Sequence, residues 1–306
     1  MAFDLRTLAQ GVLVADGAWG TQLRATGFAG PAEALNVEQP FRVEALARDY
    51  LAAGARLLST NTFSANRLAL SRFQSSLDPV TLARAGAEIA RRAADEMGGV
   101  AVGGVIGPSG RILAVREAPP DVVREAFREQ AQALVDGGVD LLVLETFSEL
   151  EECELALEAV RTVAATMPVA ACMSFDSGPQ RTLTVMRAEA GACAARLTQA
   201  GADLIGANCG AGIAHALPAV VAIRAHTDRP LWAKPSAGLP DLLEGRTAYP
   251  YTADDFGAHV PGLLDAGVAV LGGCCGTGPE HIRRVASLVA ARQRARRLSD
   301  PSPERE

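Results

Sequence analysis

Three cysteines follow apolar runs in a way that suits metal binding. Cys274 and Cys275 come directly after VAVLGG (268–273), and Cys209 closes the similar run ADLIGANC. Thiolates are soft ligands that suit zinc, and a zinc ion with three protein ligands keeps its fourth position open to a substrate. The sequence therefore predicts a Zn²⁺ site with Cys209, Cys274 and Cys275 as ligands, able to activate a substrate thiol.

The two adjacent cysteines can share one metal only if the chain leaves extended geometry. Neighbouring residues of a strand point to opposite faces, and the flanking glycines at 272, 273 and 276 permit the required turn. The alternative is a set of buried free thiols, because cysteine is often a simple core residue. That interpretation suits Cys153 and Cys193, which fall in helical patterns, and Cys172, which falls inside an apolar run.

Eight short apolar runs recur along the chain and alternate with segments of helical spacing such as 121–137. Strands that alternate with helices indicate a parallel sheet, and eight such units in about 300 residues indicate an α/β fold of the (β/α)8 TIM-barrel type, with a doubly wound open sheet as the alternative. We expect a single barrel domain over 1–292 and a charged, disordered tail over 293–306. The predicted strands are 11–15, 55–60, 100–106, 139–145, 168–175, 202–207, 230–234 and 268–273.

An internal repeat supports the barrel. The phrases AGARLLSTNTF, GGVDLLVLETF, AGADLIGANC and AGVAVLGGCC each begin with a small residue followed by a glycine that can end a helix, at positions 54, 138, 201 and 267. Asn61, Glu145, Asn208 and Cys274 each lie seven residues after that glycine, on the second, fourth, sixth and eighth predicted strands. The repeat thus predicts that these residues share one height at the carboxyl ends of the strands, where such barrels carry their chemistry.

Composition narrows the function further. The formal net charge of −6 argues against nucleic acid or an anionic membrane surface as the main partner. The first residues show no signal-peptide pattern, and no apolar run has the length of a membrane span. With six cysteines in a chain of this kind, we expect a cytoplasmic protein with free or metal-bound thiols.

Four motifs together resemble the homocysteine S-methyltransferase family: DGAWGTQL (16–23), ETF (145–147), GANC (206–209) and GGCCGT (272–277). The resemblance extends from about Val14 to Val289. It implies a (β/α)8 barrel with zinc on the three cysteines named above. It also implies that the amino group of homocysteine meets Asp16 and Glu145, and that its carboxylate meets the backbone around Gly17 and Ala18.

The residues themselves fit this picture. Asp16 and Glu145 end the first and fourth predicted strands, and two carboxylates facing one pocket suit an ammonium group. Glycines at 17 and 20 let backbone N–H groups approach an anion closely. The alternatives are a helix N-cap for Asp16 and a salt bridge within the barrel for Glu145.

The reaction expected from these features is methyl transfer to the thiol of homocysteine, which gives methionine. The donor stays open between a methylated corrinoid on a separate protein, S-methylmethionine or another methylsulfonium, and, less favoured, betaine. The betaine enzymes carry a tyrosine directly after the glutamate that matches Glu145, where this chain has Thr146. By contrast, TNTFSANR (60–67) and PSAGLP (235–240) are similar to the methionine synthase module. Candidate substrate contacts are Asn61, Phe63, Asn66, Asn208, Ser236 and Gly238.

Other functions are compatible with parts of the pattern. A zinc hydrolase would favour His and carboxylate ligands, and a zinc-stabilised barrel without activity would need a fourth protein ligand, such as Cys172 or a histidine. A methyltransferase for another small thiol would use the same cysteines. A homo-oligomer is compatible with the sequence.

Overall fold

A computed structural model describes residues 4–9, 11–73, 77–243 and 246–299. Eight parallel strands form one sheet in the order β1-β10-β7-β6-β5-β4-β3-β2. They are β1 (Leu13–Val14), β2 (Leu57–Ser59), β3 (Ala101–Ile106), β4 (Leu141–Phe147), β5 (Val169–Met173), β6 (Leu204–Cys209), β7 (Leu231–Pro235) and β10 (Val268–Leu271).

The sheet closes into a barrel between its first and last members. Ala15 forms a parallel bridge with Leu57, and Arg56 N–H donates to the carbonyl of Val14 over 2.8 Å. The predicted (β/α)8 barrel is therefore confirmed, and each predicted strand overlaps an observed one, although β4, β6 and β7 extend one or two residues beyond the predicted ends. A short antiparallel hairpin, β8 (Asp241–Leu243) and β9 (Arg246–Ala248), lies outside this sheet.

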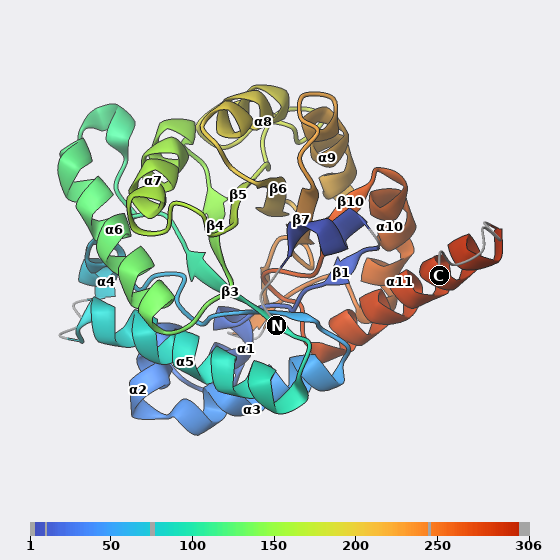
Figure 1. Ribbon diagram of the computed structural model, residues 1–306, viewed down its shortest axis with the longest axis horizontal. Coiled ribbons are helices and arrows are strands. Elements are labelled where there is room, and N and C mark those ends of the chain that lie inside the picture. Colours follow the sequence, from blue (N-terminus) through green and yellow to red (C-terminus); the bar gives the residue numbers. More distant parts are fainter. Residues whose placement is uncertain (1–3, 10, 74–76, 244–245, 300–306) are drawn as a thin grey trace.

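Helices surround the strands (Figure 1). The α-helices are α1 (Gly20–Ala25), α2 (Leu35–Glu38), α3 (Pro40–Ala52), α4 (Arg67–Leu70), α5 (Pro79–Met97), α6 (Pro120–Asp136), α7 (Leu150–Val163), α8 (Ala190–Gln199), α9 (Ala216–Arg224), α10 (Ala253–Asp265) and α11 (Pro279–Ser299). Short 3-10 helices are η1 (Leu5–Ala9), η2 (Ala32–Ala34), η3 (Ser71–Phe73), η4 (Leu113–Val115) and η5 (Ile213–His215).

The glycines of the internal repeat end helices as expected. Gly54, Gly138, Gly201 and Gly267 all have a positive φ, between 81° and 108°. Residues with a side chain adopt this conformation at a cost, so glycine allows the chain to turn from each helix into the next strand. The four repeats feed β2, β4, β6 and β10, and they deliver the residues seven positions later to one end of the barrel.

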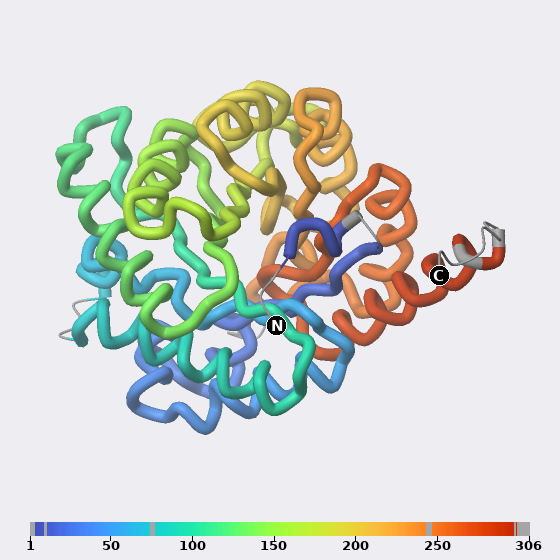
Figure 2. The backbone as a smooth tube through the Cα atoms, viewed as in Figure 1, coloured from blue at the N-terminus to red at the C-terminus, as the bar shows by residue number. Residues whose placement is uncertain are grey.

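Two apolar layers stabilise the fold. One fills the barrel interior, where Trp232 and Cys172 are fully buried, and the other packs the helices on the outside of the sheet. At the amino-terminal end of the strands Leu5 and Leu8 of η1 pack against the interior layer. Figure 2 shows η1 as the dark blue turn over the centre of the ring. The interior is thus a packed core, and any site must lie at one end of the barrel.

The last helix extends into the segment that we expected to be a disordered tail. Helix α11 continues to Ser299 and so includes the first half of the segment 293–306, while residues 300–306 lie outside the described part of the chain. His281 lies in the first turn of α11, as its sequence context indicates. Among the described residues, no helix combines the length and apolar character needed to cross a membrane.

Candidate metal centre and adjoining pocket

The three cysteines come together at the carboxyl ends of the strands. The Sγ atoms of Cys209, Cys274 and Cys275 all lie within 4.8 Å of one another, and no further Cys, His, Asp or Glu of the described residues joins this group. Three sulfurs around a tetrahedral zinc ion, each about 2.3 Å from it, would be separated by about 3.8 Å. The donor set and spacing therefore fit zinc with one position left open.

Local backbone geometry makes this convergence possible. Cys209 is the last residue of β6 and has a positive φ of 58°, while Cys274 and Cys275 lie beyond the end of β10, where Gly276 has a φ of 80°. Strand β7 lies between β6 and β10, and the N–H of Cys274 donates to the carbonyl of Pro235 at its end over 2.9 Å. The chain thus leaves extended geometry at the adjacent pair, as predicted.

The thiols interact with one another when they carry their protons. Hydrogen bonds from Cys209 and Cys274 lower the pKa of the Cys275 thiol well below its usual value, whereas contacts with Cys274 and Cys275 raise the pKa of Cys209. The first proton is therefore lost readily from this group, and the negative charge on that sulfur resists loss of the next. A cation placed among the sulfurs would remove this resistance, as expected for a metal site.

A pocket of about 340 Å³ adjoins the three sulfurs. It is formed by the loops that follow β1, β2 and β10 and by the carboxyl-terminal ends of β4, β6 and β7, and its wall includes Gly17, Ala18, Glu145, Lys234 and Cys274. The size falls in the usual range of small-molecule sites, roughly 300–1,000 Å³. Both carboxylate and sulfur groups thus border one space, although they come from distant parts of the chain.

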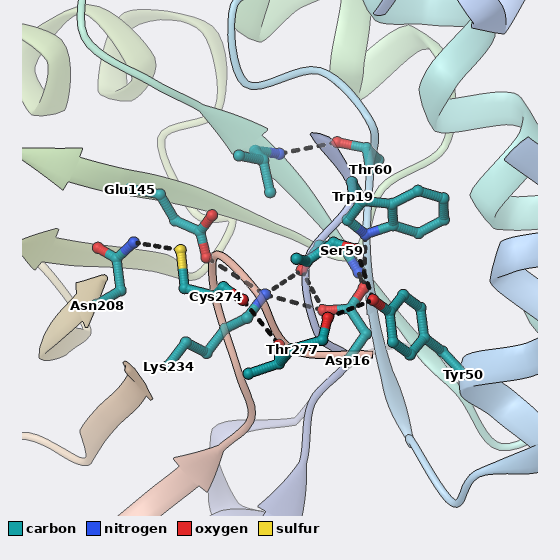
Figure 3. Close-up of polar contacts among 12 residues, drawn as sticks. Asp16, Trp19, Tyr50, Ser59, Thr60, Glu145, Asn208, Lys234, Cys274 and Thr277 are labelled. Carbon is teal, nitrogen blue, oxygen red and sulfur yellow. Dashed lines mark hydrogen bonds and ion pairs between the residues drawn. The ribbon is translucent and has the colours of Figure 1, made fainter. Parts of the chain in front are cut away.

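Asp16 forms the centre of a buried polar cluster (Figure 3). Its Oδ1 accepts hydrogen bonds from the hydroxyl of Ser59 and from Lys234 Nζ, both over 2.8 Å. Its Oδ2 accepts from the N–H of Ser59 over 2.7 Å and from Trp19 Nε1 over 2.9 Å. Four donors thus surround a side chain that has no solvent exposure. The N-cap alternative for Asp16 finds no support, because α1 has no side-chain cap.

Glu145 lies on the other side of Lys234. Its Oε1 is 3.4 Å from Nζ, which is an ion-pair contact, and this buried oxygen has no hydrogen-bond partner among the described residues. Burial raises the pKa of Glu145 to about 7, with Lys234 acting in the opposite direction and nearby Cys274 and Asp16 adding to the rise. For Lys234 the charges of the two carboxylates outweigh burial and raise its pKa. The salt-bridge alternative for Glu145 is therefore partly correct.

A bulge in β4 directs Glu145 and the residue after it. Pairing with β5 is regular up to Leu144 and shifts before Phe147, and Thr146 between them has a φ of 63°. Asn208 holds this conformation, because its Oδ1 accepts from the N–H of Thr146 over 2.7 Å and its Nδ2 donates to the Thr146 hydroxyl over 2.6 Å. Bulges of this kind often re-aim side chains next to active sites.

The loop after β1 is held from two sides. Tyr50 donates its hydroxyl to the carbonyl of Ala18 over 2.5 Å, and its ring meets that of Trp19 at a centroid distance of 6.0 Å. A side chain on residue 17 would lie 2.8 Å from the Thr277 hydroxyl and 2.9 Å from that of Tyr50, so this position requires Gly17. The expected carboxylate-binding backbone is thus rigid and borders the pocket.

Three expected substrate contacts have protein partners. The Nδ2 of Asn61 donates to the carbonyl of Ala32 and to Asn36, which links the loop after β2 to η2 and α2. The Ser236 hydroxyl bonds to backbone carbonyls after β6 and β7, and Asn208 also places Nδ2 3.8 Å from the sulfur of Cys274. Their contact with a substrate stays a prediction.

Sequence reasoning did not single out Lys234, Ser59 or Tyr50. The first of these had one visible signal, a lysine at the end of the apolar run PLWAK, which is unusual in a strand buried on both faces. The other two had none, because their role depends on contacts with residues far away in the sequence.

The fold and site define a (β/α)8 barrel that carries a three-thiol centre beside a pocket with buried carboxylates at the carboxyl ends of its strands. The family described as homocysteine S-methyltransferase matches residues 13–289, so the chain belongs to that family, and the resemblance carried by the four motifs is confirmed.

Individual relatives agree with this membership. The chain is similar to methionine synthase of Mycobacterium tuberculosis, with 33% identity over 98% of this chain and 26% of that protein, and to bovine betaine–homocysteine S-methyltransferase 1, with 31% identity over 91% and 72%. It therefore spans about a quarter of the length of the methionine synthases it matches. The metallated form of the homocysteine methyltransferase MmuM from Escherichia coli has a similar fold, with a TM-score of 0.77, 24% identity and coverage of 93% of this chain and 99% of that chain.

Proposed function

We propose that this protein transfers a methyl group to the thiol of homocysteine and so forms methionine, with Zn²⁺ as its metal. The observation that carries the proposal is the convergence of three thiols beside a pocket that also contains carboxylates. Membership of the homocysteine S-methyltransferase family supports the same reaction. A hydrolase is not supported, because the group of potential ligands contains sulfur alone.

Cys209, Cys274 and Cys275 would hold the zinc. When bound there, zinc supplies a Lewis acid that keeps a substrate thiol deprotonated at neutral pH, although a free alkyl thiol has a pKa near 8.5. A protein base at the sulfur is then unnecessary, which agrees with the finding that no histidine or carboxylate of the described residues accompanies the cysteines. The metallated form of the similar MmuM structure supports a metal in this family.

Residues in and around the pocket orient the amino acid. Glu145 in the pocket wall and the buried Asp16 beside Lys234 supply negative charge on the side of the substrate's ammonium group, and the backbone around Gly17 and Ala18 faces its carboxylate. Asn61, Asn208 and Ser236 support the loops that form this space and complete the set of proposed substrate-site residues. The attacking sulfur is then fixed relative to the methyl group, which is the main contribution of orientation to such a transfer.

The methyl donor is a corrinoid-borne methyl group on a partner protein, a methylsulfonium such as S-methylmethionine, or betaine. Quaternary ammonium groups are usually held by several aromatic side chains. The pocket wall has Trp19 and Phe63 as its aromatic residues, and the Trp19 ring nitrogen is committed to Asp16. This poor aromatic content favours the first two donors over betaine. The described cysteines are free thiols, which suits the reducing conditions of the cytoplasm.

The test is a donor panel with purified, zinc-loaded protein and L-homocysteine. Methylcobalamin, S-methylmethionine, S-adenosylmethionine and betaine are supplied separately, and methionine is measured by mass spectrometry. We expect methionine with methylcobalamin or S-methylmethionine. Failure with every donor, in protein that contains one zinc per chain, would contradict the proposal.

A matched pair of variants tests the metal. Cys274→Ala should lose both stoichiometric zinc and methyl transfer, whereas Cys193→Ala, which removes a buried thiol from α8, should keep both. Full methyl transfer by zinc-free Cys274→Ala protein would show that the thiols do not act through a metal.

A further inference from the structure

A tight turn holds the two adjacent cysteines of the thiol centre. The N–H and the hydroxyl of Thr277 both donate to the carbonyl of Cys274, over 3.0 Å and 2.7 Å, and so close a four-residue turn around Cys275 and Gly276. Gly276 has a φ of 80°, a conformation that favours glycine at the third position of such a turn. Thr277 is fully buried. Its side chain therefore helps to fix the backbone that carries two of the three thiols.

The same residue also holds the loop that follows β1. The carbonyl of Thr277 accepts a hydrogen bond from the N–H of Ala18 over 3.2 Å. It also accepts from the Gln22 side chain over 3.2 Å and from the Tyr50 hydroxyl over 3.3 Å. Figure 3 shows Thr277 with Cys274 on one side and Tyr50 on the other. One buried residue thus connects the turn of the cysteines to the loop that we propose receives the amino acid.

Two more hydrogen bonds join these two segments. The N–H of Gly273 donates to the carbonyl of Asp16 over 2.9 Å, and the N–H of Gly276 donates to the Thr21 hydroxyl over 3.2 Å. The segments 16–22 and 273–277 are therefore bonded to each other repeatedly, although they come from opposite ends of the chain. A change in the conformation of one segment must strain or break bonds to the other.

The bond to Thr277 also influences which N–H groups the loop after β1 offers to a ligand. The N–H of Ala18 is directed at Thr277, whereas the described residues provide no acceptor for the N–H of Gly17 or of Trp19. Both of these residues line the pocket. Successive free backbone N–H groups can bind an anion, so their orientation matters for an amino-acid ligand, and that orientation depends on the turn at 274–277.

A metal on the cysteines would order this turn. A second ligand that needs the same ordered segments then loses less conformational entropy when it binds. We propose that Thr277 is a positioning residue that couples the thiol centre to the amino-acid pocket, so that zinc raises the affinity for an amino acid even when the ligand has no thiol. By linkage, the amino acid raises the affinity for zinc by the same factor. This inference rests on the proposed function, in which the loop after β1 receives an amino acid.

Hydrogen exchange tests the coupling without a substrate. Amide exchange of the segment 16–23 is measured by mass spectrometry in zinc-free and zinc-loaded protein, with helix α8 as the internal reference. We expect zinc to slow exchange in this segment by about 5- to 100-fold, the usual range of coupling between two sites, and to leave α8 unchanged. Exchange in 16–23 that is the same with and without zinc would overturn the inference.

Two variants that differ by one oxygen atom test the role of the hydroxyl. Thr277→Ser keeps it and Thr277→Ala removes it, and both are smaller than threonine, so neither crowds Gly17. Both proteins are measured with zinc in excess of its dissociation constant. We expect Thr277→Ser to retain the zinc-dependent slowing of exchange and Thr277→Ala to lose most of it. Equal slowing in the two variants would show that the coupling does not pass through this hydroxyl, and would overturn the inference.

Titration calorimetry measures the same coupling from the pocket. The ligand is L-2-aminobutyrate, which is homocysteine with hydrogen in place of the thiol group. Zinc should lower its dissociation constant by about 5- to 100-fold in the wild type and in Thr277→Ser, and by less than about threefold in Thr277→Ala. A dissociation constant that does not depend on zinc, or no binding to the zinc-loaded wild type, would overturn the inference. The proposed function fails separately, through the donor panel, because neither measurement involves methyl transfer.

Discussion

At the scale of single residues, the mouth of the barrel consists of side chains that connect several loops at once. Asn208 is the clearest case, because it bonds to both the backbone and the hydroxyl of Thr146 and reaches the sulfur of Cys274. Asn208 therefore links two parts of the site: the bulge in β4, which contains Glu145, and the group of three thiols. Residues that orient metal ligands in this way often matter nearly as much as the ligands themselves.

Replacing Asn208 with Ala should weaken zinc binding by about 10- to 100-fold, the usual effect of losing a partner of a metal ligand. The left-handed conformation of Thr146 would lose both of its hydrogen bonds to the side chain, and the loop after β4 would relax. Competition with a chelator of known affinity measures the change. Asn61→Ala is the control, because that amide bonds to residues around η2 and not to a thiol; an equal loss in both variants would argue against a specific role of Asn208.

The raised pKa of Glu145 predicts a pH dependence of stability. Between about pH 4.5 and about pH 7 the folded protein keeps the proton of Glu145 while the unfolded chain releases it, so stability falls as pH rises through this window. The full effect is at most about 3 kcal/mol. Glu145→Gln removes this dependence and should therefore gain stability relative to the wild type as pH rises.

The measurement is urea unfolding of the zinc-free wild type and of zinc-free Glu145→Gln at pH 5 and pH 8. Zinc-free protein is required, since a metal would add its own pH dependence. If the wild type instead became more stable relative to the variant between pH 5 and pH 8, the pKa of Glu145 in the folded protein would lie below its usual value of about 4.5. Lys234 would then be the dominant influence on that pKa.

At the scale of secondary-structure elements, the four repeated glycines share one backbone conformation but differ in their surroundings. An added Cβ on Gly201 would meet nothing within 4 Å, whereas one on Gly54 would lie 2.7 Å from the Cβ of Ala286 in α11. Gly201→Ala should therefore cost only the backbone strain, about 1–2 kcal/mol. Gly54→Ala should cost more, because α11 must also move.

Chemical denaturation of the two variants at constant pH checks this order. Both changes add the same methyl group at a positive φ, so the difference between them reports the packing of α11 against the start of β2. Equal free energies of unfolding would mean that α11 adjusts at no cost, which would contradict a close-packed outer layer.

These elements also show which features the sequence could predict. Strands were recognisable because they are apolar runs between glycine-ended helices, and the repeat placed their ends at one height. The thiol group followed from two adjacent cysteines with flanking glycines. The bulge at Thr146 was not predictable, because it depends on a side chain from β6. Two of the three residues that bond to Asp16, Ser59 and Lys234, lie 43 and 218 positions away, so no local pattern contains them.

At the scale of the whole molecule, the barrel and the thiol centre are separate parts of the structure. The two apolar layers contain none of the three clustered cysteines, which lie at the carboxyl ends of the strands. Folding is therefore not expected to depend on the metal, in contrast to small zinc domains that unfold without it. The metal should still stabilise the folded state, because it binds the assembled thiols more tightly than the unfolded chain.

Removing zinc with a chelator should thus lower the melting temperature and leave the far-ultraviolet circular dichroism spectrum unchanged at 25 °C. Adding zinc back should restore the melting temperature, and the increase should grow with the concentration of free zinc, since each tenfold rise above the dissociation constant adds about 1.4 kcal/mol. Cys274→Ala protein is the control and should not respond to either treatment. Loss of the helical spectrum on chelation would instead mean that the three thiols and their metal hold the barrel together, and the separation of core and site inferred from the packing would be wrong.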